Sequence, residues 1–152
     1  ATLRDPADDL MWDAIRADGS VEKTKWSYNT ALMIRSAAEL YELTNRPIYQ
    51  TQLRRFVRSS IRHWFEPGSG KMKDEGKFAH LLLESWQIAA KIDDELAGEV
   101  APVVEKVRAR LRTSANADGW YGPRWDTDPK SIAEPALIDQ AAVARALLFR
   151  TY

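Results

Sequence analysis

The sequence predicts an all-α protein in which helical hairpins form an inner and an outer layer. Five segments show helical periodicity, and they alternate between helices that are apolar on nearly all sides and helices that are apolar on one face only. The connections between them alternate between short and long. A helix with little polar surface must be covered by protein on most sides, so the first, third and fifth helices belong inside. This repetition is typical of an α/α solenoid or toroid.

The first two expected helices make one hairpin. The first is expected over residues 28–44, where the charged residues form one narrow stripe. The second is expected over residues 47–65, because Pro47 suits the first position of a helix and a long amphipathic pattern follows it. The polar face of this second helix carries four arginines, which we interpret as the solvent face of an outer helix and not as a nucleic-acid footprint: Arg54, Arg55, Arg58 and Arg62.

The remaining helices repeat the alternation. A mostly apolar helix is expected over residues 78–94, a half-polar one over residues 99–113 and another apolar one over residues 135–150. The segments that lead into the first, third and fifth helices are long and rich in glycine, aspartate and aromatic residues. All three are therefore expected at the same end of the helices, and a small β-hairpin is expected before the first helix. A plain antiparallel bundle with long loops is the alternative that the pattern leaves open.

Length and composition exclude several classes of protein. At 152 residues the chain suits a single domain with one sizeable core. It has 22 basic and 22 acidic residues, and this balance gives no reason to expect a nucleic-acid or acidic membrane partner. No apolar run reaches the ~18 residues of a membrane span. There is no cysteine, and His63 and His80 lack a third ligand at metal spacing, so neither a metal nor another cofactor is expected.

The end at which the long segments meet concentrates carboxylates, an amide and aromatic rings. Sugar sites use these groups, because hydroxyls bond to carboxylates and amides while sugar C–H faces stack on flat rings. Packing or helix capping is the alternative for each residue alone, as for Asp74, Asp128 and the capping pattern from Ser131 to Glu134. The clustering favours carbohydrate binding by Trp12, Asp13, Trp26, Tyr28, Asn29, Asp74, Phe78, Trp125 and Asp126, with Glu75, His80, Trp120 and Tyr121 at the same end.

Three stretches of the chain are informative together: "LMWDAIRADGSVEKTKWSYNTALMIRSAAELYELTNRPIY", "GSGKMKDEGKFAHLLLESW" and the late "GWYGPRWD" with "ALIDQAAVARAL". In these stretches the chain resembles glycoside hydrolase family 76, the endo-acting α-1,6-mannanases. The resemblance implies an (α/α)6 toroid, an α-mannan-like polysaccharide or oligosaccharide as ligand, and an extracellular or periplasmic location. The family commonly has Tyr-Asn-Gln-Gly where this chain has Tyr28-Asn29-Thr30-Ala31, so the glutamine amide of the family pattern is missing here.

The resemblance covers only the C-terminal half of such an enzyme. The family's catalytic pair, two adjacent aspartates, belongs to an earlier hairpin, so the catalytic residues are expected upstream of this chain. Two other pairs of adjacent aspartates occur, and we assign neither a catalytic role. Asp93 and Asp94 are expected at a helix C-terminus, where the dipole disfavours carboxylates. Asp8 and Asp9 match the segment just before the first helix and not the catalytic hairpin.

Three functions remain open at this stage. The chain is expected to be the C-terminal part of a retaining glycosidase, supplying the cleft wall and the sugar contacts and inactive by itself. The alternatives are a non-catalytic glycan-binding module and a structural helical domain. The fifth helix has no expected outer partner, and an apolar face of that size on a monomer marks an interface. We therefore expect self-association through the fifth and first helices, or pairing with the chain's own N-terminal half.

Overall fold

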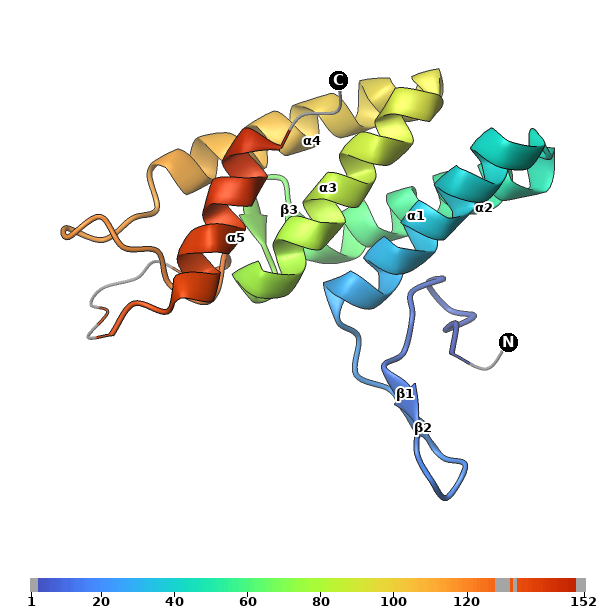
Figure 1. The fold of residues 1–152 in the computed structure, drawn as a ribbon, viewed down its shortest axis with the longest axis horizontal. Helices are drawn as coiled ribbons and strands as arrows, with labels where there is room; N and C mark the ends of the chain where they lie inside the picture. The colour runs from blue at the N-terminus through green and yellow to red at the C-terminus, as the bar shows by residue number, and fades with distance from the viewer. Residues whose placement is uncertain (1–2, 128–131, 133, 150–152) are drawn as a thin grey trace.

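A computed structural model describes residues 3–127, 132 and 134–149, and its architecture is almost entirely helical (Figure 1). The helices follow the predicted order of two hairpins and a fifth helix, so the all-α fold class is confirmed. In four of the five helices, both ends lie within two residues of the expected positions. Their bounds are α1 Ser27–Thr44, α2 Pro47–Trp64, α3 Gly76–Ile92, α4 Asp94–Arg112 and α5 Leu137–Leu148.

The helices form the two layers that the alternation predicts. α3 lies between α1 and α5 and packs against both, while α2 packs on α1 and α4 packs on α3 and α5 (Figure 1). Small buried residues such as Ala31, Ala38 and Ala79 allow the inner helices to approach closely. Trp86 of α3 is fully buried, and its Nε1 donates to Ser60 Oγ of α2 at 2.8 Å. The hydrophobic core therefore runs between the layers, with α3 at its centre.

A buried carboxylate joins the three inner helices. Glu84 of α3 is fully buried, and Arg145 of α5 donates to both of its oxygens, at 2.7 and 2.8 Å. Arg35 of α1 lies 3.5 Å from the same carboxylate. Since a buried charge is costly unless it is paired, the two arginines make the burial of Glu84 tolerable and fix the relative positions of α1, α3 and α5.

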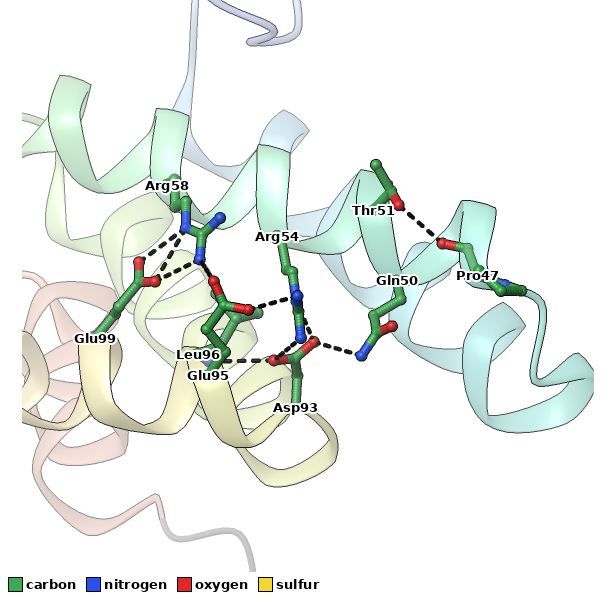
Figure 2. Close-up of polar contacts among 9 residues, drawn as sticks. All are labelled: Pro47, Gln50, Thr51, Arg54, Arg58, Asp93, Glu95, Leu96 and Glu99. Atoms are coloured by element: carbon green, nitrogen blue, oxygen red, sulfur yellow. Dashed lines mark hydrogen bonds and ion pairs between the residues drawn. The ribbon is translucent and has the colours of Figure 1, made fainter.

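The outer helices are joined by a row of ion pairs, which we call the α2–α4 ladder: Gln50, Arg54 and Arg58 on α2 with Asp93, Glu95 and Glu99 at the start of α4 (Figure 2). Arg54 Nε donates to Asp93 Oδ2 at 2.7 Å, and Arg58 Nε donates to Glu99 Oε1 at 3.0 Å. Two of the four arginines that the sequence placed on a solvent face therefore also connect the two hairpins.

The start of α4 corrects the sequence prediction, which placed it at residue 99. The helix begins at Asp94, and Asp93 is its N-cap, because Asp93 Oδ1 accepts from the backbone N–H of Leu96 at 3.2 Å. The stretch "ELAG", residues 95–98, lies between the two expected helices and would have been their short loop, but it is helical, and Gly98 lies inside α4. Asp93 and Asp94 lie at a helix N-terminus, where the dipole favours carboxylates, and not only at the end of α3.

The long connections lie at the end of the molecule where α1, α3 and α5 begin, as predicted (Figure 1). The expected hairpin before α1 is present as β1 Ala14–Ile15 and β2 Val21–Glu22. A second ribbon, β3 Phe65–Glu66 with β4 Lys71–Met72, was not predicted. Its turn ends at Gly70, with φ +74°, where a Cβ atom would lie 2.7 Å from the Lys106 carbonyl oxygen. Only glycine fits that position without displacing α4.

Candidate functional site

The starts of the three inner helices and the connections that precede them form what we call the loop end. Asp74, just before α3, holds these segments together. Its Oδ2 accepts from the N–H of Ser27 at 2.8 Å, and its carbonyl accepts from the N–H of Trp125 at 3.3 Å. Asp74 therefore satisfies a backbone donor at the start of α1 from a distant part of the chain. Asp74 is buried, and it acts on the start of α1 and not as the expected cap of α3, whose N-cap is Glu75 without a side-chain bond.

A hydrogen-bonded cluster lies where the β1–β2 hairpin leads into the start of α1. Tyr28 Oη and Asn29 Nδ2, both in the first turn of α1, each donate to Asp13 Oδ1 at 3.0 Å. Asp13 Oδ2 has no hydrogen-bond partner among the described residues. Burial, and then the bond to Asp13, raise the pKa of Tyr28, so its hydroxyl stays protonated as a donor. We call Asp13, Tyr28 and Asn29 the Asp13 cluster; its unpaired oxygen can accept a bond from a ligand.

Three aromatic rings continue from this cluster across to α3. The Phe78 ring lies 4.9 Å from the Tyr28 ring and 5.4 Å from the Trp26 ring, measured between centroids. Lys77 Nζ lies 4.9 Å from the centroid of the Phe78 ring. All three rings are half-buried, so part of each is open to solvent. Flat rings beside a polar cluster can bind both faces of a sugar, the apolar C–H face and the hydroxyls.

Trp12 borders a groove between the N-terminal segment, α1 and α2. The groove has a volume of about 860 Å³. Lys23 Nζ lies 5.3 Å from the centroid of the Trp12 ring. The lining is mostly apolar, with Leu3, Arg4, Pro6, Met11, Trp12, Met33, Gln52 and Phe56. Trp12 is therefore next in sequence to the Asp13 cluster and also borders this groove.

Trp125 and Asp126 are placed differently from the other candidates. The Trp125 ring is only 5% exposed and packs against Gly76, where a Cβ would lie 2.4 Å from Trp125 Nε1. Arg124 donates to both oxygens of Asp126, at 2.9 and 2.6 Å, and this pair lowers the pKa of Asp126. Trp125 thus contributes mainly packing at the loop end, and Asp126 is already paired. Asp128 and Ser131 lie outside the described residues.

Two residues at the start of α5 were not among the sequence candidates. Gln140 accepts from the N–H of Tyr121 at 3.1 Å and donates to the Tyr121 carbonyl at 2.9 Å, which ties the preceding connection to α5. Asp139 is buried beside it. The sequence signal for both was a pair of polar residues in the first turn of an otherwise apolar helix, but only the fold places that turn at the loop end.

The remaining polar candidates have structural partners. Asp8 Oδ2 lies 2.7 Å from Lys25 Nζ, and Asp9 Oδ2 lies 2.5 Å from Arg55 Nε. His80 Nδ1 lies 3.1 Å from the Gly76 carbonyl oxygen. Within residues 3–127, 132 and 134–149, no three histidine or acidic side chains are grouped to hold a metal ion. None of the helices described is long and apolar enough to cross a bilayer.

The family model described as Glycosyl hydrolase family 76 matches residues 2–148. No curated protein matches the chain. Among solved structures, the chain is similar to a GH76 α-mannanase of Bacteroides thetaiotaomicron, with 30% sequence identity and a TM-score of 0.83, over 95% of this chain and 40% of that chain.

Two further solved structures are similar at lower identity. An inactive variant of the α-1,6-mannanase of Salegentibacter sp. HEL1_6, in complex with α-1,6-mannotriose, is 22% identical with a TM-score of 0.82, over 96% of this chain and 46% of that chain. A protein of Listeria innocua is 21% identical with a TM-score of 0.80, over 96% and 43%. The chain therefore spans less than half the length of these three structures. The family's structures are (α/α)6 toroids, which confirms the predicted architecture.

Proposed function

The chain belongs to glycosyl hydrolase family 76, and on that premise we propose that it is the C-terminal, sugar-contacting part of a glycosidase that acts on α-1,6-linked mannan or a related α-mannoside. The names of two similar structures support this substrate class, since one is an α-mannanase and the other an α-1,6-mannanase with α-1,6-mannotriose bound. A location outside the cytoplasm, extracellular or periplasmic, fits a polysaccharide substrate and belongs to the same proposal.

The observation that carries the proposal is the Asp13 cluster beside the three rings of Trp26, Tyr28 and Phe78. The cluster offers an unpaired carboxylate oxygen, and the rings offer flat apolar surface within one side chain's reach of it. A pyranose presents the complementary pattern of hydroxyls on its rim and C–H groups on its faces. Asp13 is half-buried, so a ligand can reach this oxygen from solvent.

The proposal assigns no catalytic residue to this chain. Retaining hydrolysis needs two carboxylates about 5–5.5 Å apart, one as nucleophile and one as acid and base. Asp8 and Asp9 are each held by a cation, and Asp93 caps α4, so neither adjacent pair is arranged for that work. We propose that the catalytic pair comes from another part of the polypeptide. The purified 152-residue chain then releases no reducing ends from α-1,6-mannan.

A non-catalytic glycan-binding module is the second candidate, and the same Asp13 cluster favours it equally. The two differ in whether a hairpin with two adjacent aspartates accompanies this chain in its polypeptide. Reducing ends released from α-1,6-mannan by a longer polypeptide that contains this chain, and lost when those aspartates become asparagine, would establish the enzyme. Binding without release would establish the module.

The sugar contact is tested by replacing Asn29 with alanine. If the Asn29 side chain helps to bind a sugar hydroxyl, the variant should bind α-1,6-mannotriose more weakly by ~1–3 kcal/mol, while its thermal melting point changes little. Ser36→Ala is the matched control, an exposed position on the same helix. Calorimetric titration and thermal melts of the three proteins provide both numbers. Equal affinity for wild type and Asn29→Ala would remove Asn29 from the site.

A further inference from the structure

Two of the four arginines of α2 take no part in the α2–α4 ladder. Arg54 and Arg58 point toward α4 and are bound to its acids (Figure 2). Arg55 and Arg62 are exposed, and α2 contains no acidic residue of its own that could pair with them. The packing between the two hairpins therefore does not explain why these two guanidinium groups lie on the outer surface of α2.

The arginines of α2 border a groove on the outer layer, which we call the arginine groove. Its volume is about 390 Å³, which is near the lower end of the range for small-ligand pockets. All four arginines of α2 line it, together with Thr51, Ser59 and Asp9. The ladder acids already neutralise two of these arginines, so the positive charge that the groove offers to a ligand comes from Arg55 and Arg62.

Two donor groups on one stripe of α2 have hydrogen atoms that no described residue accepts. Arg62 Nη2 donates to Ser59 Oγ at 2.9 Å, and Arg62 has no carboxylate partner in the part of the chain that the structure describes. Ser59 is only 3% exposed; its Oγ accepts from Arg62, but its own O–H finds no acceptor among the described residues. Because buried hydroxyl groups are normally satisfied, an acceptor oxygen in the groove is the partner that this pair lacks.

Asp9 shows that the groove already accommodates one oxyanion. Asp9 is the only acid among the residues that line the groove, and its Oδ2 accepts from Arg55 Nε at 2.5 Å. The two terminal nitrogens of Arg55 make no hydrogen bond to a described residue. A planar guanidinium group can bind one anion along each of two edges, so Arg55 can hold Asp9 and a second anion together.

We propose that the arginine groove binds a phosphate or sulfate group, with Arg55, Arg62 and Ser59 as its donors. A tetrahedral oxyanion has several acceptor oxygens, and two guanidinium groups beside a hydroxyl group match them in charge and in geometry. The groove belongs to the outer layer, so the proposal does not depend on sugar binding at the loop end. The same donors suit a free inorganic ion and a phosphate group that is carried by a sugar.

A structural role for Arg62 is the competing explanation. Arg62 lies in the last turn of α2, where a cation interacts favourably with the helix dipole. It also lies four residues after Arg58, and like charges at that spacing destabilise a helix. If Arg62 serves a ligand, Arg62→Gln relieves this repulsion and melts at the same or a higher temperature in the absence of phosphate. If Arg62 serves the helix, the variant melts at a lower temperature.

The test is a calorimetric titration of the 152-residue chain with inorganic phosphate at neutral pH. Sodium chloride keeps the ionic strength constant, so that screening is equal throughout. The control is Arg112→Gln, which removes the same charge from an exposed position at the end of α4, outside the groove. We expect Arg62→Gln to bind phosphate about tenfold more weakly than wild type and Ser59→Ala roughly threefold more weakly, while the control binds like wild type.

Titrations with sulfate and with mannose 6-phosphate identify the source of the group. Tighter binding of mannose 6-phosphate than of inorganic phosphate assigns the groove to a phosphorylated sugar, and equal binding assigns it to the free ion. The inference is overturned if wild type binds phosphate no better than chloride, or if Arg62→Gln binds phosphate like wild type. A lower melting temperature of Arg62→Gln without phosphate also overturns it. None of these results affects the Asp13 cluster, which the mannotriose titrations test separately.

Discussion

The α2–α4 ladder and the loop end use the same kinds of side chain in opposite ways. In the ladder, Arg58 lowers the pKa of Glu99; burial acts to raise the pKa of Asp93, but the bonds from Arg54, Leu96 and Gln50 outweigh it and lower that pKa (Figure 2). At the loop end, Asp13 keeps one oxygen unpaired among the described residues, beside the rings of Tyr28 and Phe78. Charges in the outer layer fasten the hairpins together, whereas the Asp13 carboxylate at the loop end keeps one oxygen available.

This difference indicates that the loop end, and not the ladder, is the region that binds a sugar. Proteins pair nearly all of their buried polar groups, whereas a half-buried acceptor such as the free Asp13 oxygen can take its partner from a ligand. In this chain the ladder lies between the outer helices α2 and α4, and the Asp13 cluster lies at the start of α1. Substitutions in the ladder should lower folding stability and leave sugar binding intact. Substitutions at the loop end should weaken sugar binding and leave folding stability intact.

The largest expected effect concerns the two edges of the inner layer, α1 and α5, where large apolar side chains are exposed to solvent. Leu137 and Leu148 of α5 are 83% and 77% exposed, and Leu43 of α1 is 83% exposed. We propose that these edges pack on further helices of the same polypeptide, or on a second copy when those helices are absent. Light scattering of the 152-residue chain at micromolar concentration should give the mass of a dimer.

Substitution of the exposed leucines of α1 and α5 tests whether these edges form the interface. Leu43→Gln combined with Leu148→Gln should return the chain to a monomer, and Ile15→Gln on the β1–β2 hairpin should leave the dimer intact. A wild-type chain that is monomeric at all concentrations and binds no hydrophobic dye would show that the edges of the inner layer are covered by the chain itself.

The next largest effect is the loss of a ladder residue. Asp93→Ala removes the N-cap of α4 and the acceptor for Arg54 and Gln50. We expect the free energy of unfolding to fall by about 2 kcal/mol, about half from the cap and half from the lost charge-assisted bonds. Urea denaturation measures this, with the exposed neighbour Asp94→Ala as control. A loss of sugar affinity in Asp93→Ala beyond that of the control would show that the ladder also affects binding at the loop end.

A smaller effect is expected when one hydroxyl is removed at the loop end. Tyr28→Phe keeps the ring contact with Phe78 and deletes the bond to Asp13. Affinity for α-1,6-mannotriose should fall by about 1 kcal/mol, or roughly fivefold, because Asp13 is less firmly held for its ligand. Titration calorimetry with Tyr41→Phe as the control, at the opposite end of α1, checks it. The account is contradicted if Tyr28→Phe binds as tightly as wild type.

The smallest effect concerns the ladder at low pH. Asp93 and Glu99 have lowered pKa values, so their stabilisation is present above the ordinary carboxylate range and is lost only as the pH falls through the lowered values. Over a pH series, the melting temperature of Asp93→Ala should therefore fall less steeply at low pH than that of wild type, because the variant has already lost one of these two carboxylates. Equal slopes would show that Asp93 does not contribute to the loss of stability in acid.

The sequence predicted the layers better than the connections. Helix periodicity and the alternation of apolar and half-polar helices were sufficient for α1, α2, α3 and α5, because burial follows directly from the pattern. The start of α4 was placed too late because Gly98 was taken as a loop residue. Asp93 as N-cap overrides that signal, and the cap depends on a hydrogen bond within the first turn that composition does not reveal.

The candidate site was predictable in part. Tyr28 and Asn29 head a buried helix, and this placed them correctly at the loop end together with Asp13. The roles of Asp74 and Trp125 depend on contacts between segments far apart in the chain, which a single sequence does not specify. The bonds between Gln140 and Tyr121 could not be recognised for the same reason, because they join α5 to residues far from it in the sequence.

The most direct test of the central claim is a titration with α-1,6-mannotriose of wild type, Asp13→Asn and Asp93→Ala, with a thermal melt of each. Asp13→Asn removes the charge that is free at the loop end, and Asp93→Ala removes one that is paired in the ladder. The account predicts that Asp13→Asn binds about tenfold more weakly, or ~1.4 kcal/mol, and melts like wild type. It predicts that Asp93→Ala melts at a lower temperature and binds like wild type. Equal affinities for wild type and Asp13→Asn would contradict it.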